Sequence, residues 1–101
     1  SALIRITYNK QNGFIYNDAV LATLPKKNIG NVYEYMLREN YNMKGNSFSV
    51  WQNKIILGSV IYKDDLTADT GLNLYKRLFQ KADDYDDILV REYGCKTVDV
   101  D

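Results

Sequence analysis

Residues 66–94 have the pattern of one long amphipathic helix, and this helix limits most strongly how the chain can fold. Between positions 72 and 93 apolar residues recur every three or four positions, which is the period of one helix face. They are Leu72, Tyr75, Leu78, Phe79, Ala82, Tyr85, Ile88, Leu89 and Tyr93. Thr67 or Asp69 can cap the first turn, and Gly94 stands where helices often end in a left-handed residue. Some 25 helical residues extend roughly 35 Å, so the helix needs a broad apolar partner surface.

Alternating residues before this helix predict strands. Ile4, Ile6 and Tyr8 alternate with polar residues over 3–8, and Asn12-Gly13 then predicts a tight hairpin turn with positive φ at both residues. Residues 14–24 continue as one long strand, or as two short strands if Asn17-Asp18 forms a bulge or a second turn. Pro25 ends this segment because it cannot donate to a β-ladder.

The middle of the chain predicts a short helix and a second hairpin. Asn28 is the expected cap of a helix over 28–40, whose apolar stripe is Val32, Tyr35 and Met36 together with Tyr33 or Leu37. Residues 41–45 connect it to a strand at 48–51, which turns at Gln52-Asn53 into a strand at 55–62. That last strand is apolar on both faces, so we expect it in the centre of the sheet, with Gly58 admitting a close helix. The predicted class is therefore α+β: a twisted antiparallel β-sheet with helices packed on one side and a long C-terminal helix.

Length and charge limit the function. The 101 residues predict a single domain over 1–95 and a frayed tail over 96–101, and Ser1-Ala2 is typical of a tag-cleavage remnant on a domain excised from a longer protein. Thirteen basic and 13 acidic residues give a formal charge of zero, so we expect no nucleic-acid partner. No apolar run approaches the roughly 18 residues of a membrane span, so no membrane partner is expected either. One cysteine and no histidine argue against an internal disulfide and an ordinary zinc or haem site, and favour a reducing, cytoplasmic compartment.

The order of elements resembles the type III secretion chaperone-like fold family, including its bacterial YbjN-like relatives. The resemblance covers residues 4–93 and rests on the helix after Leu24-Pro25, its end at Leu37-Arg38-Glu39-Asn40, the hairpin over 48–62, and the closing helix with Ala82-Asp83-Asp84-Tyr85. It implies a homodimer or a domain that binds an extended segment of another protein, with neither catalysis nor a cofactor.

Aromatic residues supply the candidate interface. Tyr and Trp offer large contact areas with a polar tip and are enriched at protein interfaces. One interpretation is that they complete a small core, through Tyr8, Tyr35, Tyr75, Tyr85 and Trp51. The other is that the second hairpin exposes apolar surface or a strand edge to a partner protein or a second copy. The candidate interface residues are then Phe48, Val50, Trp51, Ile56 and Tyr62.

Neither a catalytic nor a metal site is predicted. Asp83, Asp84, Asp86 and Asp87 have oxygen ligands suited to divalent cations, but adjacent helical residues point apart, so a solvated acidic face is the expectation. Cys95 has no histidine to serve as its base, so an incidental thiol is expected. The sequence thus predicts a non-enzymatic protein-interaction domain. The alternative is a regulatory or sensory module that binds a small ligand in a pocket beneath the long helix.

Overall fold

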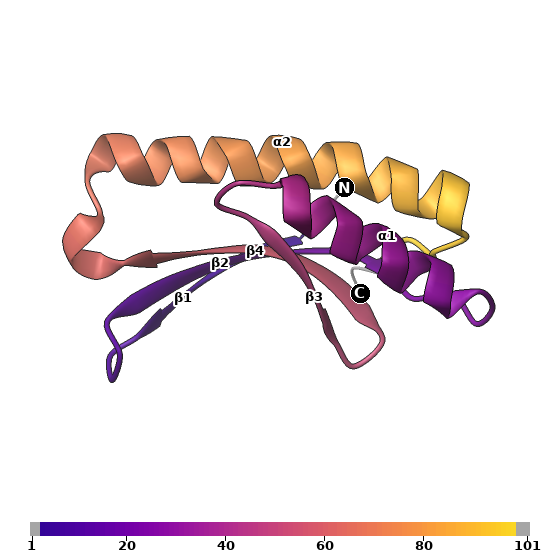
Figure 1. The fold of residues 1–101 in the computed structure, drawn as a ribbon. Helices are drawn as coiled ribbons and strands as arrows, with labels where there is room; N and C mark the ends of the chain where they lie inside the picture. The colour runs from indigo at the N-terminus through magenta and orange to yellow at the C-terminus, as the bar shows by residue number, and fades with distance from the viewer. Residues whose placement is uncertain (1–2, 99–101) are drawn as a thin grey trace.

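The computed structural model describes residues 3–98. Its elements are, in chain order, β1 (Leu3–Asn9), β2 (Phe14–Thr23), α1 (Ile29–Asn42), β3 (Ser47–Trp51), β4 (Lys54–Tyr62), a short 3-10 turn (Lys63–Asp65) and α2 (Ala68–Tyr93). The strands form one antiparallel sheet in the order β1-β2-β4-β3, and both helices lie on the same side of it (Figure 1). This arrangement confirms the predicted α+β class and the central position of β4.

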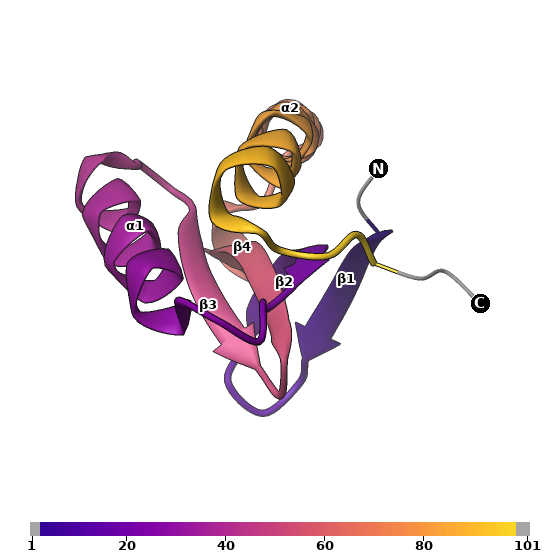
Figure 2. The same cartoon turned by 90° about the vertical axis from the view of Figure 1, so that its right-hand side faces the viewer.

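The core lies between the sheet and the two helices. Viewed along α2, α1 lies on one side of this helix and β1 on the other (Figure 2). Alternate strand residues face the helices, because side chains on a strand point to opposite faces in turn. The fully buried residues that fill this layer are Ala19, Leu21, Ala22, Val32, Ile55, Leu57, Leu78, Ala82 and Leu89. The other face of the sheet, which we call the open face, is covered by neither of the two helices described within residues 3–98 (Figure 1).

The ends of α2 agree with the local signals in the sequence. The Thr67 hydroxyl accepts a hydrogen bond from the backbone N–H of Thr70, so Thr67 rather than Asp69 is the cap. Gly94 ends the helix at φ 71°. Lys96, which falls in the predicted frayed tail, exchanges two backbone hydrogen bonds of 2.8 and 3.0 Å with Thr23. These backbone hydrogen bonds fix the position of Lys96, although the side-chain pattern of this segment predicts no regular structure. Residues 99–101 lie outside the described part of the chain.

Both predicted turns of the N-terminal half differ in detail. The first hairpin has a longer loop than a two-residue turn, and only Gly13 takes a positive φ there. The Asn9 side chain accepts hydrogen bonds from the backbone N–H groups of Gln11 and Asn12, which stabilises this loop. β2 is a single strand, and its irregularity lies between Val20 and Ala22 rather than at Asn17-Asp18. This bulge shifts the register near the end of β2, and Ala22 and Thr23 still pair with β4 beyond it.

Two further expectations are wrong. Asn28 precedes α1, but at φ 61° its side chain makes no capping hydrogen bond, and the helix continues to Asn42. Gly58 lies close to no helix. A Cβ atom at Gly58 would lie 2.6 Å from Oδ1 of Asp18, a neighbouring side chain on the open face. Because Gly58 has no side chain, there is room for Asp18 on the open face. The glycine is not needed for contact with a helix on the opposite face.

The apolar stripe of α2 is only partly buried. Leu78, Ala82 and Leu89 are covered, whereas Leu72, Tyr75 and Phe79 are 52%, 43% and 57% exposed. Residues 72, 75 and 79 lie on one flank of the helix, since they are three and four positions apart. The other flank faces α1, where the Tyr85 hydroxyl donates to Glu39. No helix among residues 3–98 covers the flank above β1 (Figure 2).

Candidate protein-binding surface

The five candidate interface residues do not lie on one surface. Phe48 and Ile56 are each only 6% exposed, and the Phe48 ring packs edge-on against Tyr85 at 4.9 Å between centroids. Val50 faces the helix side with Phe48, whereas Trp51 and Tyr62 belong to the open face with Ile56. Their role in an interface stays a prediction. The structure shows that a partner can reach Val50, Trp51 and Tyr62.

The edge of β3 is occupied by a side chain from α1. Asn40 Nδ2 donates to the Phe48 carbonyl at 3.2 Å, and the Phe48 N–H donates to Asn40 Oδ1 at 2.6 Å. An edge strand normally presents such unpaired N–H and C=O groups to any incoming strand. Asn40 satisfies both groups of Phe48, in the second position of this five-residue strand. α1 therefore obstructs strand addition at β3.

Of the usual protections, the opposite edge, β1, carries only a single charged residue. It has seven residues, pairs with β2 in unbroken register and contains no proline. Native edge strands are usually protected by charge, proline, a bulge or short length. The single charged residue of β1 is Arg5, which points to the open face because it pairs with Asp18 there. The helix-facing side of β1 is uncharged.

Exposed apolar residues lie on this edge strand and on the flank of α2 that faces its side of the sheet (Figure 2). Ile6 and Tyr8, on the helix-facing side of β1, are 62% and 46% exposed. Together with the exposed flank of α2 they form what we call the β1–α2 patch, made of Ile6, Tyr8, Leu72, Tyr75 and Phe79. An aromatic side chain carries roughly 150–250 Å² of surface. The rings of Tyr8, Tyr75 and Phe79 are about half exposed, so these three alone leave roughly 200–350 Å² uncovered. The largest apolar patch of a typical monomer, about 300–600 Å², is often functional, so the β1–α2 patch is a candidate interaction site.

An apolar groove lies at the β3 edge of the sheet, opposite the β1–α2 patch. It has a volume of about 300 Å³, lies between α1 and β3, and is lined by Tyr33, Met36, Leu37, Asn40, Phe48, Ser49 and Val50. Leu37 is 69% exposed at its rim. The Asn40–Phe48 hydrogen bonds lie in this groove, so it can receive apolar side chains but has fewer free backbone groups than β1.

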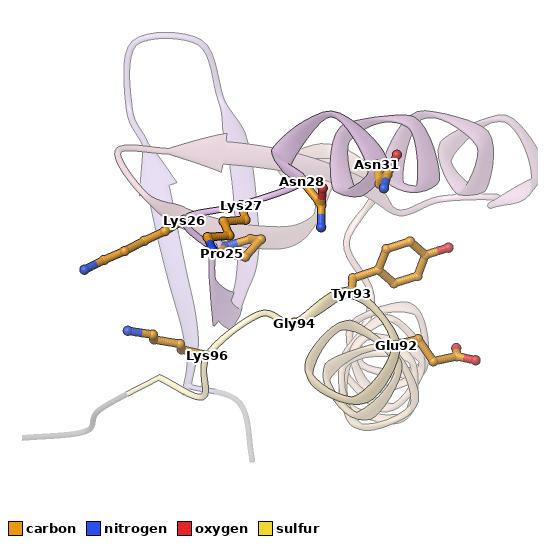
Figure 3. A pocket seen from close by; sticks show the side chains of 9 residues that line it. All are labelled: Pro25, Lys26, Lys27, Asn28, Asn31, Glu92, Tyr93, Gly94 and Lys96. Atoms are coloured by element: carbon orange, nitrogen blue, oxygen red, sulfur yellow. The ribbon is translucent and has the colours of Figure 1, made fainter.

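A larger cavity opens where the C-terminal segment meets the start of α1 (Figure 3). It has a volume of about 560 Å³ and is lined by Pro25, Lys26, Lys27, Asn28, Asn31, Glu92, Tyr93, Gly94 and Lys96. Lys26 and Lys96 point together into solvent at one end, and Tyr93 forms the other end (Figure 3). Tyr93 is stacked on Tyr35 at 4.5 Å between ring centroids. This contact fixes the position of the Tyr93 ring beside α1.

A tyrosine cluster joins the two helices. Tyr85 donates to Glu39 Oε1 at 2.9 Å, and Tyr35 packs edge-on against the Tyr85 ring. Burial raises the pKa of Tyr85 to about 12, with further contributions from its hydrogen bond to Glu39 and from the charge of Glu39. Burial, and then the Glu39 charge, also raise the pKa of Tyr35. Both hydroxyls thus stay protonated at neutral pH, and the cluster is a structural contact between α1 and α2.

Asp86 departs from the expected solvated acidic face, whereas the position of Cys95 fits the expected incidental thiol. Asp86 is buried rather than solvated, because the C-terminal segment folds back over it. Asp86 lines a cavity of about 110 Å³ together with Thr97 and Val98 of that segment. Cys95 is buried, and this burial raises its pKa, so its thiol is poorly reactive. Among residues 3–98, no group of three or more acidic or thiol side chains could hold a metal ion. None of the helices described there is long and apolar enough to cross a membrane.

Comparison with known proteins bears on the fold. No family model matches the chain, and no curated protein matches its sequence. Four chains of solved structures match it, among them a chain in the crystal structure of the ExsC–ExsE complex. That match has a TM-score of 0.69 at 13% sequence identity and covers 88% of this chain and 74% of the other. The chain therefore shares the chaperone-like α+β fold that its sequence resembles.

Proposed function

We propose that this chain is a non-enzymatic domain that binds an extended segment of another protein along β1. The observation that carries the proposal is the edge of β1, protected only by the charge of Arg5, beside the exposed β1–α2 patch. Support also comes from the shared fold, since one solved chain that matches it belongs to a two-protein complex, ExsC–ExsE.

Strand addition explains why both features are needed. An incoming strand forms main-chain hydrogen bonds with the free edge, which give affinity but little specificity. Every second side chain of that strand would then point towards the helix layer. Those side chains would pack against Phe79 and Tyr75, whose rings lie 6.3 Å apart. The preferred segment is therefore one with apolar residues at alternate positions.

The narrower assignments belong to the same proposal. We place the protein in the bacterial cytoplasm and among the YbjN-like relatives on the strength of the family resemblance. A second copy of the chain is a further possible occupant of β1, because antiparallel pairing of two identical edges is self-complementary. Centring that pair on Ile6 would bring Ile4 opposite the Tyr8 of the other copy, and Arg5 opposite its Thr7.

The test compares the two edges of the sheet. Peptides selected from a display library of extended sequences are titrated against the protein, and hydrogen exchange locates the protected amides. We expect protection in Leu3–Asn9. Ile6→Lys should weaken binding about tenfold or more, since a lysine on an edge strand opposes strand addition. Leu37→Lys is the matched control, because it places the same charge on a similarly exposed apolar residue of α1, at the groove beside β3.

Two outcomes would contradict the proposal: protection of β3 instead of β1, or a larger loss with Leu37→Lys than with Ile6→Lys. Light scattering during size-exclusion chromatography tests the second copy separately. A mass near twice 11.7 kDa that returns to 11.7 kDa in Ile6→Lys would identify the partner as the chain itself. A monomer that binds the selected peptide would identify a different protein.

A further inference from the structure

The open face of the sheet carries a polar cavity that protein binding at β1 does not use. It has a volume of about 350 Å³ and is lined by Tyr16, Asp18, Gly45, Asn46, Ser47, Ser49, Gly58, Ser59 and Val60. The register places Tyr16, Asp18, Ser47 and Ser49 on the face away from the helices. A cavity of this volume is at the small end of those that hold organic ligands.

Gly58 creates the floor of this cavity. It lies between Asp18 on β2 and Ser47 on β3 in the register of the sheet. A Cβ atom there would lie 2.6 Å from Asp18 Oδ1 and 3.3 Å from the Asn17 carbonyl oxygen. The Asp18 carboxylate therefore leans into space that any other residue at this position would fill.

The groups around this floor are rich in hydrogen-bond acceptors. Within residues 3–98, Asp18 makes no hydrogen bond and no ion pair, although Arg5 lies opposite it on β1. Asn46, another lining residue, is 8% exposed, and its Oδ1 atom has no hydrogen-bond partner among those residues. A buried polar atom without a partner is costly, but this atom is covered, so the accessible acceptors of the cavity are those of the other lining residues. The hydroxyls of Ser47 and Ser49 can accept as well.

We infer that this cavity binds a small organic cation, through a primary ammonium or guanidinium group held by Asp18 and the neighbouring acceptors. Both groups carry several N–H donors and no acceptor, which matches the lining. A charged donor on a carboxylate also forms a stronger hydrogen bond than a neutral one. The group can come from a free amine or from a lysine or arginine side chain of another polypeptide.

The test follows backbone amide shifts of the whole chain by NMR during titration with putrescine. Butanediol is the matched neutral probe, because its hydroxyls replace the two amines on the same carbon chain. We expect putrescine to shift the amides around Asp18, Gly58 and Ser47, and butanediol to bind at least about tenfold more weakly, since it lacks the charge. Asp18→Asn should reduce putrescine affinity by a similar factor, whereas Asp64→Asn, on the exposed 3-10 turn, should leave it unchanged.

A blocked tripeptide with a central lysine distinguishes the two sources. Binding of putrescine points to a free amine, and binding of the tripeptide alone points to a side chain of a partner protein. The inference is overturned if neither probe binds at millimolar concentration, or if putrescine and butanediol bind equally. It is also overturned if a folded Asp18→Asn variant binds like the original chain. Ile6→Lys should not change these titrations. A failure of the cation site can therefore be told apart from a failure of peptide binding at β1.

Discussion

The side-chain amide of Asn40 pairs with both backbone polar groups of Phe48, so a residue of α1 occupies the place of a neighbouring strand at the edge of β3. The two edges of the sheet are consequently unequal. The backbone groups of the short strand β3 are partly hydrogen-bonded by α1, whereas β1 is longer and is protected only by the charge of Arg5. This inequality is the reason for placing a binding partner at β1.

Asn40→Ala should destabilise the fold and free the β3 edge. The substitution removes two hydrogen bonds, which together contribute about 1–3 kcal/mol to the free energy of unfolding. Urea denaturation measures this loss. Asn42→Ala is the control, because the Asn42 side chain makes only an exposed 3.5 Å contact with the Arg38 carbonyl, and its expected effect is within about 0.5 kcal/mol. Equal losses in both variants would show that Asn40 does not protect the edge.

Phe48→Ala should cost far more than truncation of its neighbour. The Phe48 ring is buried against Tyr85, and removing a buried aromatic side chain costs about 3–5 kcal/mol. Val50→Ala, on the same strand but 40% exposed, should cost less than about 1 kcal/mol. Chemical denaturation of the two variants checks the difference. A small effect of Phe48→Ala would mean that Phe48 is not a core residue.

Tyr85 makes stability depend on alkaline pH. Its pKa is raised from 10.0 to about 12 in the fold, so the neutral phenol is favoured by folding. The corresponding stabilisation is complete below pH 10.0 and is lost as the pH rises towards about 12. Tyr85→Phe removes this pH-dependent contribution. Unfolding free energies of the original chain should therefore fall more steeply over this pH range than those of the variant.

Tyr41→Phe supplies the control for this pH series, because Tyr41 is almost fully exposed. Its unfolding free energy should follow the original chain at every pH. Parallel pH curves for Tyr85→Phe and the original chain would contradict the assigned hydrogen bond between Tyr85 and Glu39.

Two glycines should respond oppositely to alanine. Gly94 ends α2 at φ +71°, where a Cβ atom is strained, so Gly94→Ala should destabilise by about 1 kcal/mol. Gly30 lies in α1, and no neighbouring element comes within 4 Å of the position that a methyl group would take there. Gly30→Ala should therefore stabilise by about 0.4–1 kcal/mol, because alanine loses less backbone entropy in a helix. Thermal unfolding of both variants is the measurement, and a shift in the same direction would contradict the assignment.

Local signals account for much of the fold. Period and capping residues placed α2 within two residues of its observed ends, since both depend on neighbours along the chain. Apolar residues on both faces placed β4 in the centre of the sheet, because a central strand is the one most covered by its neighbours. In the sequence, Asn40 could be identified only as the expected end of the helix over 28–40. Its contact with Phe48 spans eight positions and a turn, so no local pattern announces it.

Burial along α2 could not be read from the chain. The same helical period contains Leu89, which is buried, and Phe79, which is exposed, because coverage depends on where the other elements lie beside α2. Asp86 is buried for the same reason, since a segment beyond Gly94 returns over it. Interactions between near neighbours in the sequence were enough to fix which segments become helices and strands. The packing of distant segments then settled which apolar faces stay free to bind, because burial is a property of the assembled layers.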